Sequence, residues 1–388
     1  MSNQDIIKSS FQKWKIWTAI FLGLSVASFM LYRSLSEIRF VKVGSGNGTH
    51  RWIDGNHNKV VDLSQAIDFK LDESGDYKRE SLSDVLLAIC WTEKTFFWIF
   101  MALLFMVGRD FFYMWRIRLL TNEQLTWRKS FSVIMLWEFA SSLSPGVVGG
   151  AAVAMFILNK EKIALGRSTA IVFISTMMDN LFYVMMIPIT FFFISSADLF
   201  PVTYFGSQAL QVVFWTGYTF IAIAAFLLFV ALFIWPSFSK RLLSGLFSLP
   251  FLKRWKTKAI QTGDDIIVTS KEMKKETFTA WIKVFLITCG SWISRYLVIN
   301  AILQAFLDLS LYDHVLILGK QFVLWLFMLV SPTPGASGVA EYAFGELLVS
   351  FSGSTVLLAG MAIIWRLISY FPYLFIGAWI LPRVLRKK

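Results

Sequence analysis

The chain has 388 residues, of which 56% are hydrophobic and 16% charged. A soluble domain carries about 45–50% apolar and about 25% charged residues, so this composition indicates a protein with several membrane spans and excludes a soluble enzyme. The formal net charge of +12 would suggest a nucleic-acid partner in a soluble protein, but in a membrane protein it first reports on orientation. We expect no nucleic acid, no cofactor and no metal site, because the two cysteines, Cys90 and Cys289, lie in separate hydrophobic stretches.

Six stretches provide the roughly 20 apolar residues that a helix needs to cross the roughly 30 Å hydrocarbon core of a bilayer. They are residues 16–36, 95–115, 168–194, 209–235, 281–303 and 354–381. The first is too long for the apolar region of a cleavable signal peptide, and no small-residue cleavage site follows it, so we expect it to remain as a span. The sequence predicts an all-α integral membrane protein that forms one polytopic domain over residues 1–388.

Two further apolar stretches, residues 131–158 and 321–349, are each interrupted by proline and glycine. Their arms are too short to cross a bilayer alone, so each stretch is either one kinked helix or a re-entrant hairpin. The charges favour hairpins, because most of the 37 basic residues then lie on one side, and the short outer loops 195–208 and 304–319 carry none. We therefore expect two re-entrant hairpins that enter from opposite faces, with both termini cytoplasmic and the protein in a bacterial inner membrane.

Two loops are long enough to have a role of their own. Residues 37–94 form an outer, extracytoplasmic insertion whose polarity predicts a small cap or a flap that lies on the membrane. Residues 236–280 form an inner loop that mixes apolar residues with lysine and arginine, which predicts a basic amphipathic segment at the lipid headgroups. An ordinary positive-inside loop explains this second segment equally well.

The two breaks resemble each other. Residues 145–151 and 334–340 share the pattern P-G-x-x-G-x-A and lie almost half a chain apart. Because the predicted hairpins enter from opposite sides, this match indicates an inverted repeat of the kind found in transporters. The alternative is that proline and glycine merely kink two packed helices.

The hairpin interpretation assigns a role to each residue of the breaks. Ser144 and Thr333 would be N-caps, and Pro145 and Pro334 would be the first helical residues. Each second helix would then present its positive N-terminal end to a phosphate or carboxylate at mid-membrane. Four glycines would allow backbone or ligand to approach closely: Gly146, Gly149, Gly335 and Gly338.

Ionisable residues inside the predicted spans and hairpins are few. A charged side chain at mid-span costs at least about 2.5–3.5 kcal/mol on insertion scales, so each requires a partner or a polar cavity. Asp179 either pairs with Arg295 or Arg366 and locks helices together, or takes part in binding, and the two roles can coexist. Arg109, near the inner end of its span, could extend toward the interface. The full set of polar candidates is Arg109, Glu138, Asp179, Asn180, Arg295, Lys320, Glu341 and Arg366.

Enzymatic motifs are absent from the sequence. It contains no G-x-x-x-x-G-K-[ST], no H-E-x-x-H and no G-x-S-x-G, and all three histidines, His314 among them, fall in predicted outer loops. We therefore expect no enzymatic activity. The alternative is a membrane-embedded lipid-modifying enzyme with a carboxylate site built from Glu138, Asp179 and Glu341.

Three ordered segments then resemble a known family: R-D-F-F-Y-M-W-R-I-R-L-L at 109–120, S-P-G-V-V-G-G at 144–150 and P-G-A-S-G-V-A-E at 334–341. They are similar to landmarks of the lysylphosphatidylglycerol synthase transmembrane family, which includes the flippase domain of bacterial multiple-peptide-resistance proteins. The resemblance covers about residues 15–385. Two positions depart from the pattern, since Ala336 replaces the second glycine of the last motif and Ala340 replaces the arginine before Glu341.

The resemblance implies the lipid-translocating part of that family, and we expect no aminoacyl-transferase domain after Lys388. The residues and the resemblance together predict a flippase that moves an anionic phospholipid or lipid-linked headgroup between leaflets. A non-catalytic subunit of an envelope assembly remains a rival, and homo-oligomerisation and coupling to a proton or another ion stay open. We expect Arg295, Arg366, Gly146 and Gly335 to bind the phosphate, and Asp179, Glu138 and Glu341 to balance its charge or release it. Lys320 is expected at the outer mouth of the pathway and Arg109 at the inner mouth.

Overall fold

The computed structural model describes residues 38–42, 46–55, 66–81, 91–144, 148–200, 207–237, 241, 245, 248, 256–331, 333–336, 339–352 and 355–386. The predicted span 16–36 lies outside the described residues, as do three of the candidate site residues in the two breaks: Pro145, Gly146 and Gly338.

Within the described residues, six helical stretches are long and apolar enough to cross a membrane. Four are continuous helices: α4 (Glu93–Leu120), α7 (Leu165–Phe193), α12 (Phe278–Phe306) and α13 (Leu311–Val330). The fifth joins α9 (Ser207–Phe229) to a π-helical turn (Val230–Ile234), and the sixth joins α15 (Thr355–Ser369) to α16 (Phe371–Arg386). The predicted all-α membrane class is confirmed.

Side-chain caps explain where several of these helices begin. The hydroxyls of Thr92, Thr126 and Thr277 accept a hydrogen bond from the third residue of α4, of α5 (Trp127–Leu143) and of α12. Ser310 and Asp313 form a reciprocal capping box at the start of α13. The outer loop predicted at 304–319 is therefore wrong in its second half, because α13 already begins at Leu311 and includes His314.

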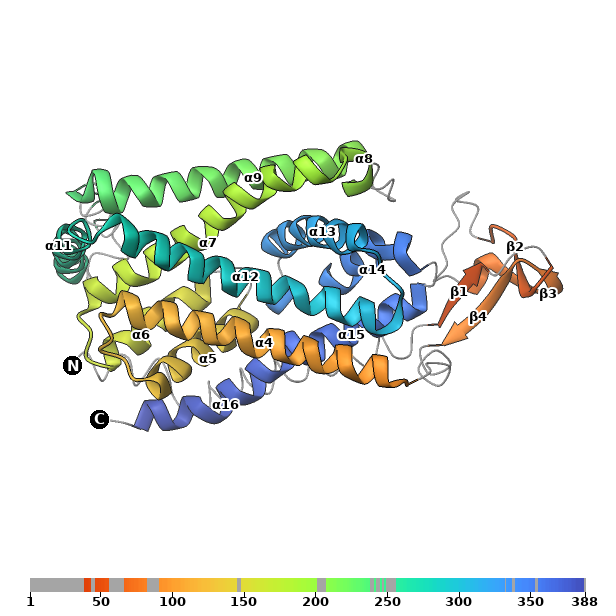
Figure 1. The fold of residues 1–388 in the computed structure, drawn as a ribbon, viewed down its shortest axis with the longest axis horizontal. Coiled ribbons are helices and arrows are strands. Elements are labelled where there is room, and N and C mark those ends of the chain that lie inside the picture. The colour runs from red at the N-terminus through yellow and green to blue at the C-terminus, as the bar shows by residue number, and fades with distance from the viewer. Residues whose placement is uncertain are drawn as a thin grey trace.

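The helices of the two predicted hairpins are shorter than a span, with one exception. Helix α5 packs against α6 (Val148–Lys160), and α13 packs against α14 (Val339–Ser352). In Figure 1, α5 and α6 lie in the half of the molecule that holds α11 (Lys256–Met273), whereas α13 and α14 lie in the half next to the β-strands. The first arm of the second pair is not too short to cross, since α13 has 20 residues. Re-entry into a membrane stays a prediction for both pairs.

A small antiparallel sheet occupies much of the predicted outer insertion. Its strands are β1 (Ile38–Lys42), β2 (Gly48–Trp52), β3 (Phe69–Gly75) and β4 (Tyr77–Ser81), in the spatial order β1-β4-β2-β3. The rings of Phe40 and Phe69 stack with centroids 4.1 Å apart and form its apolar centre. These strands were not predicted from the sequence, and the role of the insertion as a cap or flap stays a prediction.

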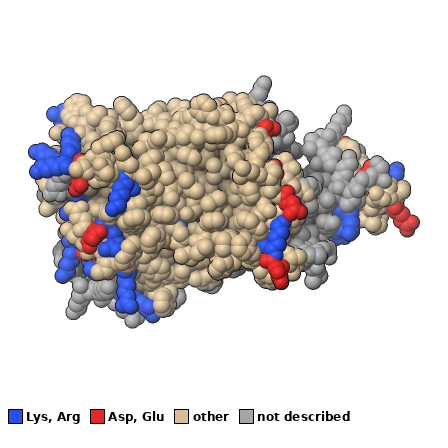
Figure 2. Space-filling view, in the orientation of Figure 1, with Lys and Arg blue, Asp and Glu red and all other residues tan. Residues whose placement is uncertain are grey.

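Charged side chains collect at the two ends of the molecule. Figure 2 shows a broad middle band with almost no lysine, arginine, aspartate or glutamate, and a concentration of lysine and arginine at the end that holds α11. The C-terminal end of α4, the start of α12 and the end of α16 lie at this same end in Figure 1. We call it the basic end. The β-sheet lies at the opposite end.

Candidate functional site

Arg109 on α4 is the centre of a buried group of charges. Its guanidinium donates to Asp110 Oδ1 at 2.8 Å and to the Tyr373 hydroxyl at 2.6 Å, and lies 2.7 Å from Glu138 Oε1. Tyr373 in turn donates to Asp110 at 2.7 Å, so α4, α5 and α16 meet here. The prediction that Arg109 reaches toward the interface and guards a mouth is wrong, because its side chain is 1% exposed and its charge is matched inside the bundle.

Arg116, two turns further along α4, forms a second group. Its guanidinium binds the Asp179 carboxylate through both oxygens, at 2.6 and 3.2 Å, and Trp292 Nε1 donates to the same carboxylate at 2.9 Å. Neither arginine that the sequence offered as partner of Asp179, Arg295 or Arg366, forms this pair. The bidentate geometry gives both charges the compensation that a position inside a span demands.

The Tyr113 ring connects the two groups. The guanidinium carbons of Arg109 and Arg116 lie 4.5 and 4.7 Å from its centroid. These residues are spaced i, i+4, i+7 and therefore share one face of α4. That spacing is visible in the sequence, but Arg116 lies one residue beyond the predicted span 95–115 and is not among the polar candidates predicted from the sequence. Tyr113 and Tyr373 are not among them either.

A third group surrounds Arg366 on α15. Its Nε lies 2.8 Å from Glu341 Oε1 on α14, and its Nη2 donates to the backbone carbonyl of Ala336 at 3.3 Å. Ala336 belongs to η4 (Pro334–Ala336), the one turn of helix inside the second break. Arg366 therefore connects η4, inside that break, to α14, which follows it.

The second break and the last turn of α5, which precedes the first break, meet at Tyr370, the residue between α15 and α16. Its ring packs so closely on Gly335 that a Cβ added there would lie 2.2 Å from Tyr370 Cε2, and its hydroxyl donates to the Ser142 carbonyl near the end of α5 at 3.1 Å. The backbone around η4 also contacts α5. Glu138 precedes Ser142 by one helical turn, so Arg366, Tyr370, Glu138 and Arg109 follow one another through the bundle.

The predicted N-caps are wrong. Ser144 is the C-cap of α5, in extended backbone conformation, and its hydroxyl donates to the Ala140 carbonyl at 2.8 Å. Thr333 precedes only the short turn η4, because Gly335 and Ala336 have left-handed φ values of 58° and 53° that a right-handed helix cannot continue through. The second helices begin later, at Val148 and Val339.

The remaining candidates have different surroundings. Lys320 is 2% exposed and donates to the Leu347 carbonyl at 2.8 Å and to Ser350 Oγ at 3.0 Å, so it connects α13 to α14 and does not sit at an outer mouth. Gly149 lies where a Cβ would come 2.3 Å from Ser144 Oγ, which allows α6 to approach α5 closely. Asn180 is half-buried on α7 beside Asp179.

Arg295 differs from the arginines of the three groups. It is half-buried on α12 and lies 5.5 Å above the Trp292 ring. Among the described residues it has no carboxylate partner. Trp292 also donates to Asp179, so Arg295 is next to a paired charge without belonging to the pair.

The conformation of the second break yields an opposite pair of predictions for stability. Gly335→Ala should destabilise the protein, because a left-handed residue with a Cβ costs about 1–2 kcal/mol and Tyr370 must also move. Ala336→Gly should stabilise it by about 1 kcal/mol by removing such a Cβ. Thermal unfolding in detergent, followed by tryptophan fluorescence, measures both, and equal melting temperatures for the two variants would contradict the left-handed conformation.

The architecture defines an integral membrane protein whose helices enclose a line of paired charges. Residues 78–377 match the family described as lysylphosphatidylglycerol synthase TM region, and the chain belongs to this family. The predicted resemblance is confirmed. The chain is also similar to a UPF0104 membrane protein of Archaeoglobus fulgidus, with 24% identity over 300 residues that cover 72% of this chain and 85% of that relative. No solved structure matches the chain.

Proposed function

We propose that this protein moves an anionic phospholipid or lipid-linked headgroup between the leaflets of a membrane. One observation carries the proposal: paired charges and hydroxyls follow one another from Arg366 through Tyr370, Glu138 and Arg109 to Arg116. Such a line is expensive inside a bilayer, so a role in passing a polar headgroup explains its presence. Membership of a family linked to lipid handling supports the same class of substrate.

The proposed step is an exchange of partners. A lipid phosphate approaches an arginine, takes over its hydrogen bonds and displaces the carboxylate that held them. The displaced carboxylate, Asp179, Glu138 or Glu341, then takes up a proton or a cation, which links translocation to ion movement. Because the arginine is never left without an anion, the exchange avoids an unpaired charge in the membrane.

We assign the first contact with the phosphate to Arg295, because it lies near the middle of α12, beside the paired Asp179, and has no carboxylate partner among the described residues. The basic end would face the cytoplasm of a bacterium, since lysine and arginine collect there. The hairpins α5–α6 and α13–α14 would enter from the cytoplasmic and the outer face, respectively.

The test is a lipid-flipping assay in proteoliposomes, with a fluorescent phosphatidylglycerol and a membrane-impermeant quencher. Arg295→Gln should slow flipping roughly tenfold or more, since a charge-assisted hydrogen bond contributes about 1.5–3 kcal/mol. The protein should still fold, because no ion pair is broken. Arg128→Gln, which removes an exposed arginine at the start of α5, is the matched control and should flip at the wild-type rate.

Three outcomes would count against the proposal. A wild-type rate for Arg295→Gln would remove this arginine from the pathway. Wild-type protein that redistributes no lipid would remove the flippase function and favour a subunit role. A covalently altered lipid, detected by mass spectrometry of the vesicles, would favour the lipid-modifying enzyme.

A further inference from the structure

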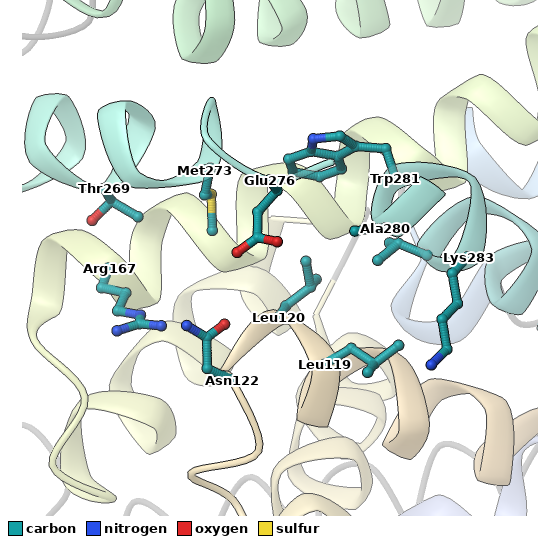
Figure 3. Close-up of a pocket in the computed structure, with 11 residues that line it drawn as sticks. Leu119, Leu120, Asn122, Arg167, Thr269, Met273, Glu276, Ala280, Trp281 and Lys283 are labelled. Atoms are coloured by element: carbon teal, nitrogen blue, oxygen red, sulfur yellow. The ribbon is translucent and has the colours of Figure 1, made fainter. Parts of the chain in front are cut away.

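A cavity of about 230 Å³ opens at the basic end, about one turn of α4 beyond Arg116. It is formed by the end of α4, the start of α7, α11 and the start of α12 (Figure 3). Its volume far exceeds the roughly 10–15 Å³ that one water requires, yet is below the roughly 300 Å³ of sites for drug-sized ligands. The space therefore suits a small group and not a whole lipid.

The position of the cavity sets the depth at which a ligand would bind. Three candidate spans begin or end around it, so it lies at the level where the helices leave the apolar band. Trp281 lines it, and tryptophan is enriched at this depth in membrane proteins. Leu120, Met273 and Val284 are buried and form an apolar floor. This is the depth of lipid headgroups.

Two basic residues of the polar lining have no carboxylate partner. Arg167 and Lys283 both line the cavity, and in the described part of the protein neither forms an ion pair; the Lys283 ammonium lies 5.8 Å from the centroid of the Trp115 ring. The Nε–H of Arg167 is shielded from solvent and donates to no described atom. In Figure 3 the Arg167 guanidinium points toward the Asn122 side chain, at the cavity, while the carboxylate of exposed Glu276 points into the same space. A buried donor without an acceptor is expensive, so an anionic acceptor fits here.

We propose that this cavity binds a phosphate group, with Arg167 as the main contact and Lys283 and Asn122 as further donors. The source is a phospholipid headgroup or a free phosphate. The Glu276 carboxylate repels the anion and so lowers the affinity of the site for phosphate. The site does not depend on the proposed translocation, because none of its lining residues belongs to the line of paired charges.

The test is native mass spectrometry of the full chain in detergent with dihexanoyl phosphatidylglycerol, dihexanoylglycerol and inorganic phosphate as separate probes. Arg167→Gln should weaken phosphatidylglycerol binding roughly tenfold, and Glu276→Gln should strengthen it about three- to fivefold, since it removes a like charge near the anion. Lys162→Gln is the control: it removes an exposed lysine from the turn before α7 and should leave binding unchanged.

Each outcome decides the proposal. Opposite effects of Arg167→Gln and Glu276→Gln support it. If inorganic phosphate binds as tightly as the lipid, the site belongs to a free phosphate; if only the lipid binds, it belongs to a headgroup. Equal binding of dihexanoylglycerol, or equal losses in Arg167→Gln and Lys162→Gln, would overturn it. Unchanged binding in Arg295→Gln keeps this test separate from the test of flipping.

Discussion

Replacing Arg116 by alanine is expected to destabilise the protein by roughly 3–5 kcal/mol, the typical effect of removing one partner of a buried ion pair. Arg116 is only 4% exposed, and its loss leaves the Asp179 carboxylate with Trp292 as its remaining described donor. Thermal unfolding in detergent, or the yield of monodisperse protein after purification, measures the effect. It should be the largest destabilisation among single substitutions on the α4 face.

A double variant separates two contributions to the loss of stability, the unpaired Asp179 charge and the lost packing of the Arg116 side chain. Arg116→Gln combined with Asp179→Asn keeps two side chains that can hydrogen-bond to each other but removes both charges, so most of the stability should return. Recovery of stability without recovery of flipping would show that the pair is also needed for transport. If Arg116→Ala alone melts like wild type, the pairing seen here is not the one that the membrane protein uses.

Replacing Arg366 by alanine is expected to reduce flipping at least about tenfold, because Arg366 holds Glu341 and the Ala336 carbonyl together at the second break. The proteoliposome assay measures the rate. Because the substitution also leaves Glu341 without its partner, reduced folding could lower the rate as well, and the amount of folded protein must be compared first.

Arg366→Gln combined with Glu341→Gln is the informative second variant. The exchanged pair is then neutral and the protein should insert and fold close to wild type, whereas flipping should stay low because position 366 no longer offers a cation to the phosphate. Lys320→Met gives a contrast, since Lys320 joins α13 to α14 without a carboxylate and should affect stability more than the flipping rate per folded molecule. A neutral double variant that flips like wild type would exclude an exchange of partners at Arg366.

The sequence was sufficient for features that depend on local composition. A run of about 20 apolar residues identifies a span wherever it occurs, which is why the stretches predicted at 168–194 and 281–303 coincide with α7 and α12 to within a few residues. Ser310 and Asp313 have the spacing of a capping box and mark the start of α13 in the sequence as well, although both fall in the predicted outer loop 304–319. The strands of the insertion were missed because short alternating segments give a weak signal.

The identity of the ion pairs could not be read from the sequence. Burial demands that Asp179 have a cationic partner, but Arg116, Arg295 and Arg366 all satisfy that demand chemically. Only the packing of α4 against α12 and α7 selects Arg116. Likewise, the repeated glycines mark both breaks in the sequence, but the contact of the second break with α5 through Tyr370 depends on how the helices pack. The sequence by itself determined which charged groups need a partner inside the membrane. Only the tertiary structure decided which residue is the partner of each, because hydrogen bonds and ion pairs require contact between helices that are distant in the chain.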